Sequence, residues 1–455
     1  MSSIGPPTGM RDWLPQDALL RQRLMETISS VYRLYGYLPI DTPAMEDLAV
    51  LLGKGGGENE KLLFKILKRG EKLAQAKDEL ADYGLRYDLT VPLARFVATH
   101  QGKIPKVFRR YHIGPVWRAD RPQKGRFREF YQCDIDVVGG ASSAYEVEII
   151  TATERVLNEL GFRKYWFRIS DRRLLPLLLT GYGVPQNKIS SIAVLLDKLD
   201  KISSMELHAE LNEILQKDSS PWRKLRLLID RASTNVDHTV LLATVLEHYE
   251  KHFSEIDPVV KVEIDQIVSG LGRIIKSVRA INSNSRLIFH PILVRGMDYY
   301  TGPIYEAVVE GCSSAVLGGG RYDDLIGQLA GRKIPAVGCS IGFERILSLL
   351  QEREAGHAVG SVPRALLICD EQDAALLQQQ AERLRNEGLC IETYLDHDDV
   401  GKQFKYAETA GITWAIKHFD AASSSLTVRY LPDRSDHLWY ILQCESYRII
   451  LLYSA

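Results

Sequence analysis

Apolar residues recur with helical spacing in two N-terminal stretches. Leu20, Leu24, Ile28 and Val31 are three or four residues apart, so they share one face of a helix that should begin near Pro15 and end near Gly36. The same spacing returns in residues 142–160. Between them, residues 37–45 read as an extended segment, because each proline biases the residue before it away from the helical region. Residues 53–57 (GKGGG) read as a loop.

Residues 107–140 have the pattern of two strands joined by the polar loop DRPQKGR. Residues 286–311 and 334–341 again have a composition typical of strands, and a helix is expected from Phe343. Residues 185–285 are helical, charged and without obvious chemistry, which indicates a helical insertion. After a linker at 361–363, three apolar runs alternate with two helical stretches. That order predicts a small α/β domain with a largely parallel sheet.

Composition narrows the protein class without naming a function. The 455 residues include 45% hydrophobic and 25% charged side chains, which is ordinary globular usage and suggests about three domains. No apolar run approaches the ~20 residues of a membrane span, so we expect no membrane association. The six cysteines are scattered, which favours a reducing cytoplasm over a disulfide framework or a zinc site.

Positive charge is concentrated in one segment of an almost neutral chain. Between Lys106 and Arg128, eight basic residues face one acidic residue, Asp120, whereas the whole chain carries a net charge of −1. The chain as a whole is not basic, so a globally basic binding surface is not indicated. The local excess of +7 indicates instead that this one segment contacts an anionic partner.

Polar side chains alternate along the second strand of this segment. Phe130, Gln132, Asp134 and Asp136 project to one face, because alternate residues of a strand share a face. One interpretation is a solvated face of an antiparallel sheet. The other is the floor of a polar pocket beside an arginine-rich hairpin, suited to a ligand with a phosphate and a hydrogen-bonding group.

Three further stretches suggest a lined site, and several familiar motifs are missing. LVRGMDYYTG (293–302) contains Arg295, and GGGR (318–321) is followed by GCSIGFERIL (338–347). No Walker lysine motif and no dinucleotide-binding glycine motif occurs, and no histidines have metal-ligand spacing. Lys402 and Lys405 share a helical face that is either solvated or placed against a phosphate backbone.

These residues resemble the histidyl-tRNA synthetases, a family of class II aminoacyl-tRNA synthetases. TGMRDWLP (8–15) looks like the family's opening, and YLPIDTP resembles class II motif 1, a dimer-interface element. Residues 116–139 resemble motif 2 and residues 338–346 resemble motif 3. LVRGMDYYTG and GGGRYDDLIGQLAG (318–331) resemble the two peptides that distinguish this family from other class II enzymes.

The resemblance implies an α+β fold with three parts. A class II core, with an antiparallel sheet flanked by helices, would span residues 1–184 and 286–355. A helical insertion would span 185–285, and an α/β domain similar to the family's anticodon-binding domain would span 364–455. Residues 435–455 read as apolar strands where a polar tail or a short helix is usual, which is a departure from the family.

The resemblance also implies a reaction and its residues. ATP would activate L-histidine to histidyl-adenylate, which is then transferred to the 3′ end of tRNA(His). Arg118 and Arg295 would contact the α-phosphate, where charge develops in the transition state. The remaining expected contacts are Arg126, Phe130 and Arg345 for ATP, Asp88, Thr90 and Gln132 for the α-amino group, and Asp136, Tyr299, Tyr300 and Arg295 for the rest of histidine.

Cofactor and partners follow from the same resemblance. Mg²⁺ is expected on the β- and γ-phosphates of ATP without a dedicated metal site in the protein. The partners would be ATP, L-histidine, tRNA(His) and a second copy of the chain, in the cytoplasm. Asp134 has no assigned role.

Two other hypotheses remain at this point. The first is a non-catalytic, histidine-sensing regulatory paralogue of histidine biosynthesis. Such paralogues tend to lose the catalytic arginines and the terminal domain, whereas Arg118, Arg295 and Arg345 are all present here. The second is a nucleic-acid-binding module without catalysis, which would not require Gln132 and Asp136 in line beside the basic segment.

Overall fold

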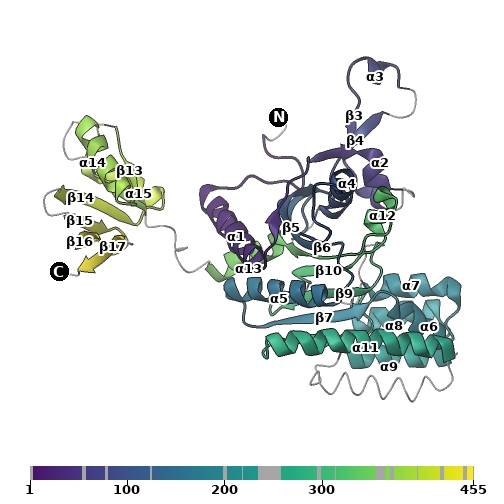
Figure 1. Ribbon diagram of the computed structural model, residues 1–455. Helices are drawn as coiled ribbons and strands as arrows, with labels where there is room; N and C mark the ends of the chain where they lie inside the picture. The colour runs from purple at the N-terminus through teal and green to yellow at the C-terminus, as the bar shows by residue number, and fades with distance from the viewer. Residues whose placement is uncertain are drawn as a thin grey trace. The chain divides into compact units, whose positions relative to one another are not determined.

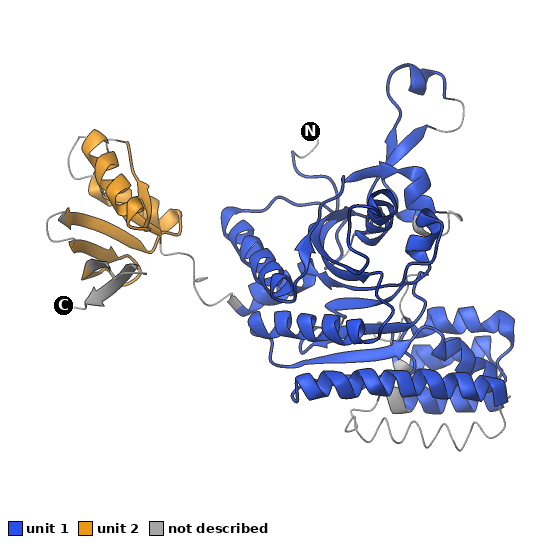
Figure 2. Ribbon diagram, in the orientation of Figure 1, with its two compact units in different colours: residues 1–353 blue, residues 354–455 orange. Residues whose placement is uncertain are grey.

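The chain forms two compact units, residues 1–353 and 354–455, which are considered separately (Figures 1 and 2). The structure is a computed structural model. It describes residues 4–53, 58–76, 80–122, 125–197, 202–217, 219–233, 258–294, 299–312, 314–354, 364–368, 374–396, 398–420, 425–443 and 448–453.

An eight-stranded sheet forms the centre of the first unit. In spatial order its strands are β1 (Leu38–Pro39), β5 (Phe108–Trp117), β6 (Glu129–Val138), β11 (Ala336–Gly342), β10 (Leu317–Arg321), β9 (Pro303–Val309), β7 (Tyr165–Asp171) and β8 (Leu287–Phe289). Only the two edge strands, β1 and β8, pair in parallel with their neighbours. The pairs from β5 through to β7 are antiparallel, so the expected antiparallel core is confirmed.

The helices that cover the apolar face of this sheet include α1 (Pro15–Leu34), α5 (Ala144–Glu159) and α13 (Phe343–Glu354) (Figure 1). The four residues that predicted the first helix, Leu20 to Val31, are all buried in it. They share one hydrophobic core with Cys133, Ile135 and Val137 of β6. The face of β6 opposite to the predicted polar face therefore forms the main core.

The other face meets a smaller cluster of helices near the ends of β5 and β6. Helices α4 (Thr90–His100) and α12 (Leu325–Ala330) pack together there, and their core includes Phe108 and Val138. A second sheet has three strands in the spatial order β2 (Met45–Asp47), β4 (Ala81–Leu85) and β3 (Lys65–Leu67). The segments that connect these strands contain the short helices α2 (Leu48–Leu52), η1 (Glu58–Leu62) and α3 (Glu71–Ala74). Helix α4 follows β4 directly, so this small sheet leads into the segment that carries Asp88 and Thr90.

The described part of residues 174–281 contains five further helices. They are α6 (Leu174–Gly181), α7 (Gln186–Leu196), α8 (Ser204–Ile214), α9 (Ser220–Ser233) and α11 (Pro258–Ile281). Their apolar residues, such as Leu178, Leu211 and Leu271, belong to the same core as the large sheet. The helix expected within residues 239–253 lies outside the described residues. The helical character of the described part agrees with the sequence, and the proposed limits of an insertion, 185–285, stay a prediction.

The second unit is a six-stranded sheet with two helices. Its elements in chain order are β12 (Arg364–Leu367), α14 (Ala374–Asn386), β13 (Cys390–Thr393), α15 (Val400–Thr409), β14 (Trp414–Asp420), β15 (Ser425–Tyr430), β16 (Ser435–Gln443) and β17 (Arg448–Tyr453). β12 pairs in parallel with β13 and β14, as expected from the alternation of strands and helices. The last three pairs are antiparallel, so the sheet is mixed and the expectation of a largely parallel one is wrong. Parallel pairing needs a long crossover, whereas β14 to β17 are joined by short connections that allow only hairpins.

Candidate functional site

The predicted polar face of β6 exists, and it is buried. Asp136 pairs across the sheet with Arg110 of β5, and Asp134 pairs with His112. On the other side, Asp136 is opposite Gly338 of β11. Asp134 and Asp136 each expose only 2% of their surface. The interpretation of this strand as a solvated face is therefore wrong, and the carboxylates are held inside the protein.

Arg110 balances the two buried carboxylates. It is fully buried, and its Nη2 lies 2.8 Å from Asp136 Oδ2 and 3.8 Å from Asp134 Oδ2. The Tyr322 hydroxyl donates a hydrogen bond to Asp136 Oδ1. Burial raises the pKa of Asp134 to about 7 despite the opposing effect of Arg110, because an isolated charge is costly away from water. Burial raises the pKa of Asp136 as well, and Asp136 is the carboxylate closer to Arg110.

Gly338 leaves the space that the Asp136 carboxylate occupies. A Cβ atom added at this position would overlap Asp136 Oδ1. The glycine therefore serves close packing between adjacent strands, one of the roles that glycine has within sheets. This explains why a side chain as polar as Asp136 can turn back against the neighbouring strand β11.

Asp88 and Gln132 each leave one buried oxygen without a partner. Asp88 Oδ1 accepts a hydrogen bond of 3.0 Å from the backbone N–H of Val91, in the first turn of α4. The Gln132 amide nitrogen donates to Ser340 at 3.0 Å. In the part of the chain that the structure describes, Asp88 Oδ2 and Gln132 Oε1 are buried and accept no hydrogen bond. Buried polar atoms are normally satisfied, so these two acceptors are available to a cationic ligand.

Three tyrosines gather beside these acceptors. The Tyr299 ring lies 4.9 Å from the Tyr300 ring and 5.8 Å from the Tyr322 ring, measured between centroids. Tyr299 forms a side-chain hydrogen bond with Thr90, and burial raises its pKa well above the usual value. The predicted histidine-binding residues from two distant segments, 88–90 and 299–300, are thereby brought together. Tyr322 is a third member that the sequence did not single out.

The predicted ATP-binding residues fall into three groups. The Arg118 guanidinium lies 5.1 Å from the centroid of the Phe130 ring, and its Nε donates to the carbonyl of Tyr87 at 3.0 Å. Arg345 is the third residue of α13, which follows β11 directly, and it donates to the carbonyl of Ala315. Arg126 is more exposed and forms an ion pair of 2.8 Å with Asp120. Arg295 lies outside the described residues.

Much of the positive charge counted between residues 106 and 128 is neutralised within the protein. Arg109 pairs with Glu148 at 2.9 Å, Arg110 with Asp136, and Arg126 with Asp120. Among the described residues, no carboxylate lies within ion-pair distance of Arg118. The charge excess therefore overstates the positive charge that is available to a ligand, because three of these arginines are already paired.

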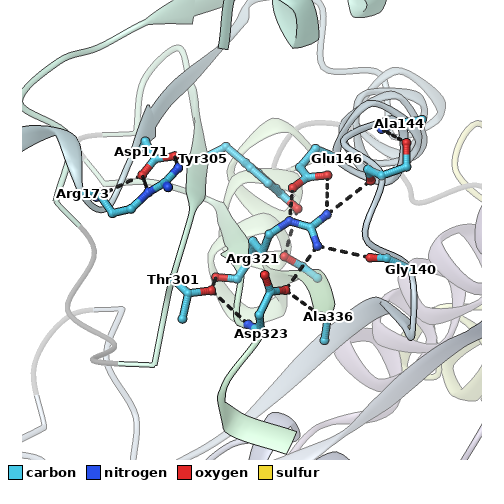
Figure 3. Close-up of polar contacts among 12 residues, drawn as sticks. Gly140, Ala144, Glu146, Asp171, Arg173, Thr301, Tyr305, Arg321, Asp323 and Ala336 are labelled. Carbon is cyan, nitrogen blue, oxygen red and sulfur yellow. Dashed lines mark hydrogen bonds and ion pairs between the residues drawn. The ribbon is translucent and has the colours of Figure 1, made fainter. Parts of the chain in front are cut away.

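Arg321 holds together the loops that carry Tyr300 and Tyr322 (Figure 3). Its Nε and Nη2 bind the two oxygens of Glu146 at 2.6 and 2.8 Å, and its Nη1 lies 3.2 Å from Asp323 Oδ1. Asp323 accepts from the Ala336 N–H and donates its own N–H to the Thr301 hydroxyl, both at 3.0 Å. The residues on either side of Tyr322 are thus tied to α5, to the start of β11 and to the residue after Tyr300.

Replacing Arg321 by methionine should lower the free energy of unfolding of the first unit by about 3–5 kcal/mol, because Glu146 would be left as a buried, unpaired charge. Glu146 exposes only 1% of its surface. Urea denaturation followed by circular dichroism measures the effect. Lys333→Met is the control, because Lys333 forms an exposed pair of 3.6 Å with Asp324 and should leave the curve unchanged. Equal curves for both variants would contradict the assigned role of Arg321.

Two residues of this site were missed from the sequence: Arg110 and Tyr322. Arg110 was counted only as part of the charge excess. The strand register would have found it, because the hairpin places it directly opposite Asp136. Tyr322 follows the GGGR turn immediately, and no pattern in the sequence indicates that its hydroxyl reaches Asp136.

Comparison with known proteins identifies the family of the chain. Residues 9–346 match the family model of histidyl-tRNA synthetase. A histidine–tRNA ligase from Leifsonia xyli subsp. xyli is 41% identical over 372 residues, covering 78% of this chain and 82% of the relative. One from Christiangramia forsetii is 36% identical and covers 90% of this chain and 91% of the relative.

Solved structures give the same result for the fold. The crystal structure of histidyl-tRNA synthetase from Nostoc sp. PCC 7120 superposes with a TM-score of 0.78 at 25% identity, covering 96% of this chain and 97% of that one. A structure from Bacillus halodurans C, described as an ATP phosphoribosyltransferase regulatory subunit/histidyl-tRNA synthetase, has a TM-score of 0.68 at 19% identity. It covers 89% of this chain and 96% of that one, and it shows the fold alone. On the family model and the extent of these alignments, the chain belongs to the histidyl-tRNA synthetase family.

Proposed function

We propose that the protein is a histidine–tRNA ligase, which activates L-histidine with ATP and transfers it to the 3′ end of tRNA(His). Beside the family membership, one structural observation supports this function. A buried acidic face offers the unpartnered oxygens of Asp88 and Gln132 together with the carboxylate of Asp136. Histidine carries an ammonium group and an imidazole N–H, which are the donors that such acceptors bind.

Within this proposal, each predicted residue has a part of the substrate to bind. Asp88, Thr90 and Gln132 bind the α-amino group, while Asp136 and Tyr300 bind the imidazole. Tyr299 orients Thr90 through their side-chain hydrogen bond. Such a site rejects analogues that lack the polar ring atoms, because its own buried groups would be left unpaired. Phe130 and Arg345 hold the adenine, and Arg126 is a peripheral phosphate contact.

The chemical step depends on positive charge at the α-phosphate. The histidine carboxylate attacks this phosphorus, pyrophosphate leaves, and negative charge builds up on the phosphoryl oxygens. We assign Arg118 and Arg295 to those oxygens, where positioned cations stabilise the transition state more than the ground state. Mg²⁺ would supply further charge neutralisation on the β- and γ-phosphates. Among the residues described, no three acidic, histidine or cysteine side chains cluster as metal ligands, so the triphosphate itself would hold the ion.

We also propose that the enzyme works as a cytoplasmic homodimer. Leu38, Met45, Leu67 and Tyr83 expose 43–64% of their surface on β1 and the three-stranded sheet, which provides apolar area for a second copy. No helix within the described ranges has the length and apolar character needed to cross a bilayer. The second unit, with Lys402 and Lys405 on α15, would contact the tRNA.

Histidine-dependent exchange of pyrophosphate into ATP tests the activation step, and charging of tRNA(His) tests the transfer. We expect exchange with L-histidine and none with the other standard amino acids. A regulatory paralogue is the competing function. It predicts histidine binding by calorimetry with neither exchange nor charging, and that combination would refute the ligase.

A further inference from the structure

The carboxylate of Glu344 connects three separate segments of the first unit. Glu344 is the second residue of α13 and exposes 6% of its surface. Its Oε2 lies 2.6 Å from Nη2 of Arg11, in the N-terminal segment. Its Oε1 lies 3.2 Å from Nη1 of Arg21, in α1, and accepts the backbone N–H of Tyr131 at 3.3 Å. We call these four residues together with Trp13 the Glu344 junction.

Aromatic rings hold the two arginines in place. The Arg11 guanidinium lies between the rings of Trp13 and Phe127, at 3.8 and 4.0 Å from their centroids. The Arg21 guanidinium lies 4.0 Å from Trp13 and 4.6 Å from Tyr131. Cation–π contacts of this kind stabilise a charge that has lost part of its hydration. The carboxylate also lies at the N-terminus of α13, where a negative charge is favoured.

The junction lies one residue away from two proposed ATP contacts. Tyr131 follows Phe130 on β6, and Glu344 precedes Arg345 on α13. The hydrogen bond from the Tyr131 N–H to Glu344 therefore links the backbone that carries Phe130 to the helical turn that carries Arg345. A change in this link would alter the separation of the two side chains that we assign to adenine.

The N-terminal segment also holds the loop between β5 and β6. The Arg128 N–H donates to the carbonyl of Gly9 at 2.8 Å. Gly9 has φ +84°, and a Cβ atom there would lie 2.8 Å from Arg128 Cγ and 2.9 Å from Pro122 Cγ. Only glycine suits both the backbone conformation and the close approach. Residues 8–13, whose sequence TGMRDW has no role in the proposed reaction, thus contact the loop that leads into β6 and Phe130.

We propose that Glu344 is a positioning residue for ATP, and that Arg11 of the N-terminal segment completes its action. The junction fixes Phe130 and Arg345 relative to one another before the nucleotide binds. This inference rests on the proposed function only for the identity of the nucleotide. Asp88, Thr90, Tyr299 and Tyr300 belong to other segments, while Gln132 and Asp136 share β6 with Tyr131 but have partners of their own in Ser340, Arg110 and Tyr322. A defect in the junction should therefore weaken ATP binding far more than histidine binding.

Calorimetric titration of the full-length protein with a non-hydrolysable ATP analogue, and separately with L-histidine, tests the proposal without requiring turnover. Glu344→Gln keeps the length of the side chain and an acceptor for Tyr131, but it removes the charge that orients both arginines. We expect the Kd for the ATP analogue to rise about tenfold and the Kd for histidine to change less than about twofold.

Arg11→Met provides a second variant in case Glu344→Gln does not fold. The Arg11 side chain is 31% exposed, and Arg21 would still neutralise Glu344, so this variant should fold. It should raise the Kd for the ATP analogue by about fivefold, and Arg11→Lys should restore part of the loss. Lys164→Met, which removes an exposed ion pair of 3.1 Å with Glu310, is the matched control and should bind both ligands normally.

The outcomes separate this inference from the function itself. Unchanged nucleotide affinity in folded Glu344→Gln and Arg11→Met, or an equal loss of affinity for histidine, would overturn the positioning role. A wild-type protein that binds the ATP analogue but shows no exchange would refute the ligase while leaving the positioning role to be decided by the variants. A wild-type protein that does not bind the analogue would refute both.

Discussion

Replacing Asp136 by asparagine should lower kcat/KM for histidine in the exchange reaction about 100-fold, since truncating one partner of a buried charged hydrogen bond typically costs 2–5 kcal/mol. Asparagine has the same shape and can still accept from Tyr322. It cannot balance Arg110, whose Nη2 lies 2.8 Å from the present carboxylate. The amide would have to turn its oxygen toward Arg110 or toward the imidazole, and it cannot satisfy both.

The loss should fall on histidine and leave ATP unaffected. Initial rates measured against each substrate in turn should show KM for ATP within about twofold of the wild type, because uniform binding of ATP is untouched. Asp134→Asn is the matched control on the same strand face, 3.8 Å from Arg110, and should lower kcat/KM less than about tenfold. A comparable loss in both variants would mean that this face acts only through the net charge around Arg110.

The strand face was predictable because the period of two is a property of the backbone. Gln132, Asp134 and Asp136 share a face in any extended conformation, and the structure confirms it. Whether that face meets water depends on other segments. The segments that carry Asp88, Tyr299 and Tyr322 lie near it. Nothing in the sequence of residues 129–138 indicates that these segments approach. The resemblance supplied those segments, and the roles that it implies for their residues stay predictions.

Arg110 shows that a count of basic residues does not distinguish buried, paired arginines from those that are free to bind a ligand. It belongs to a run of basic residues that indicates an anionic ligand, yet it is fully buried against two carboxylates. Its role depends on cross-strand register, which is set by the length of the loop between β5 and β6. The second unit gives a related result. Its parallel strands followed from strand–helix alternation, whereas its hairpin strands needed the positions of short turns.

The N-terminal segment was identified by likeness alone, and the structure gives it a physical basis. Nothing in TGMRDW indicates by itself that Arg11 reaches Glu344, which is 333 residues away in the sequence. A single charged pair of high sequence separation cannot be derived from periodicity or composition. The Arg11–Glu344 pair can be identified only from the three-dimensional structure, in which α13 lies close to β6.

Arg118→Ala should lower kcat for histidine activation by about 10²–10³-fold, which is the usual effect of removing a preorganised group that stabilises transition-state charge. The side chain is prepared for this role before ATP binds. Its Nε is anchored at 3.0 Å to the carbonyl of Tyr87, the residue before Asp88, and its guanidinium lies over the Phe130 ring. The anchor places one fixed cation between the proposed amino-group site and the proposed adenine site.

The split between kcat and KM decides whether Arg118 acts in the transition state. If it stabilises developing charge, single-turnover formation of adenylate should slow while the Kd for ATP rises only slightly. Arg118→Lys keeps a positive charge but loses the anchored, planar guanidinium, so it should recover only a small part of the rate. Arg126→Ala is the control, because Arg126 is exposed and already paired with Asp120, and its loss should cost less than about tenfold. A weaker affinity for ATP with an unchanged rate of adenylate formation would assign Arg118 to ground-state binding of the nucleotide.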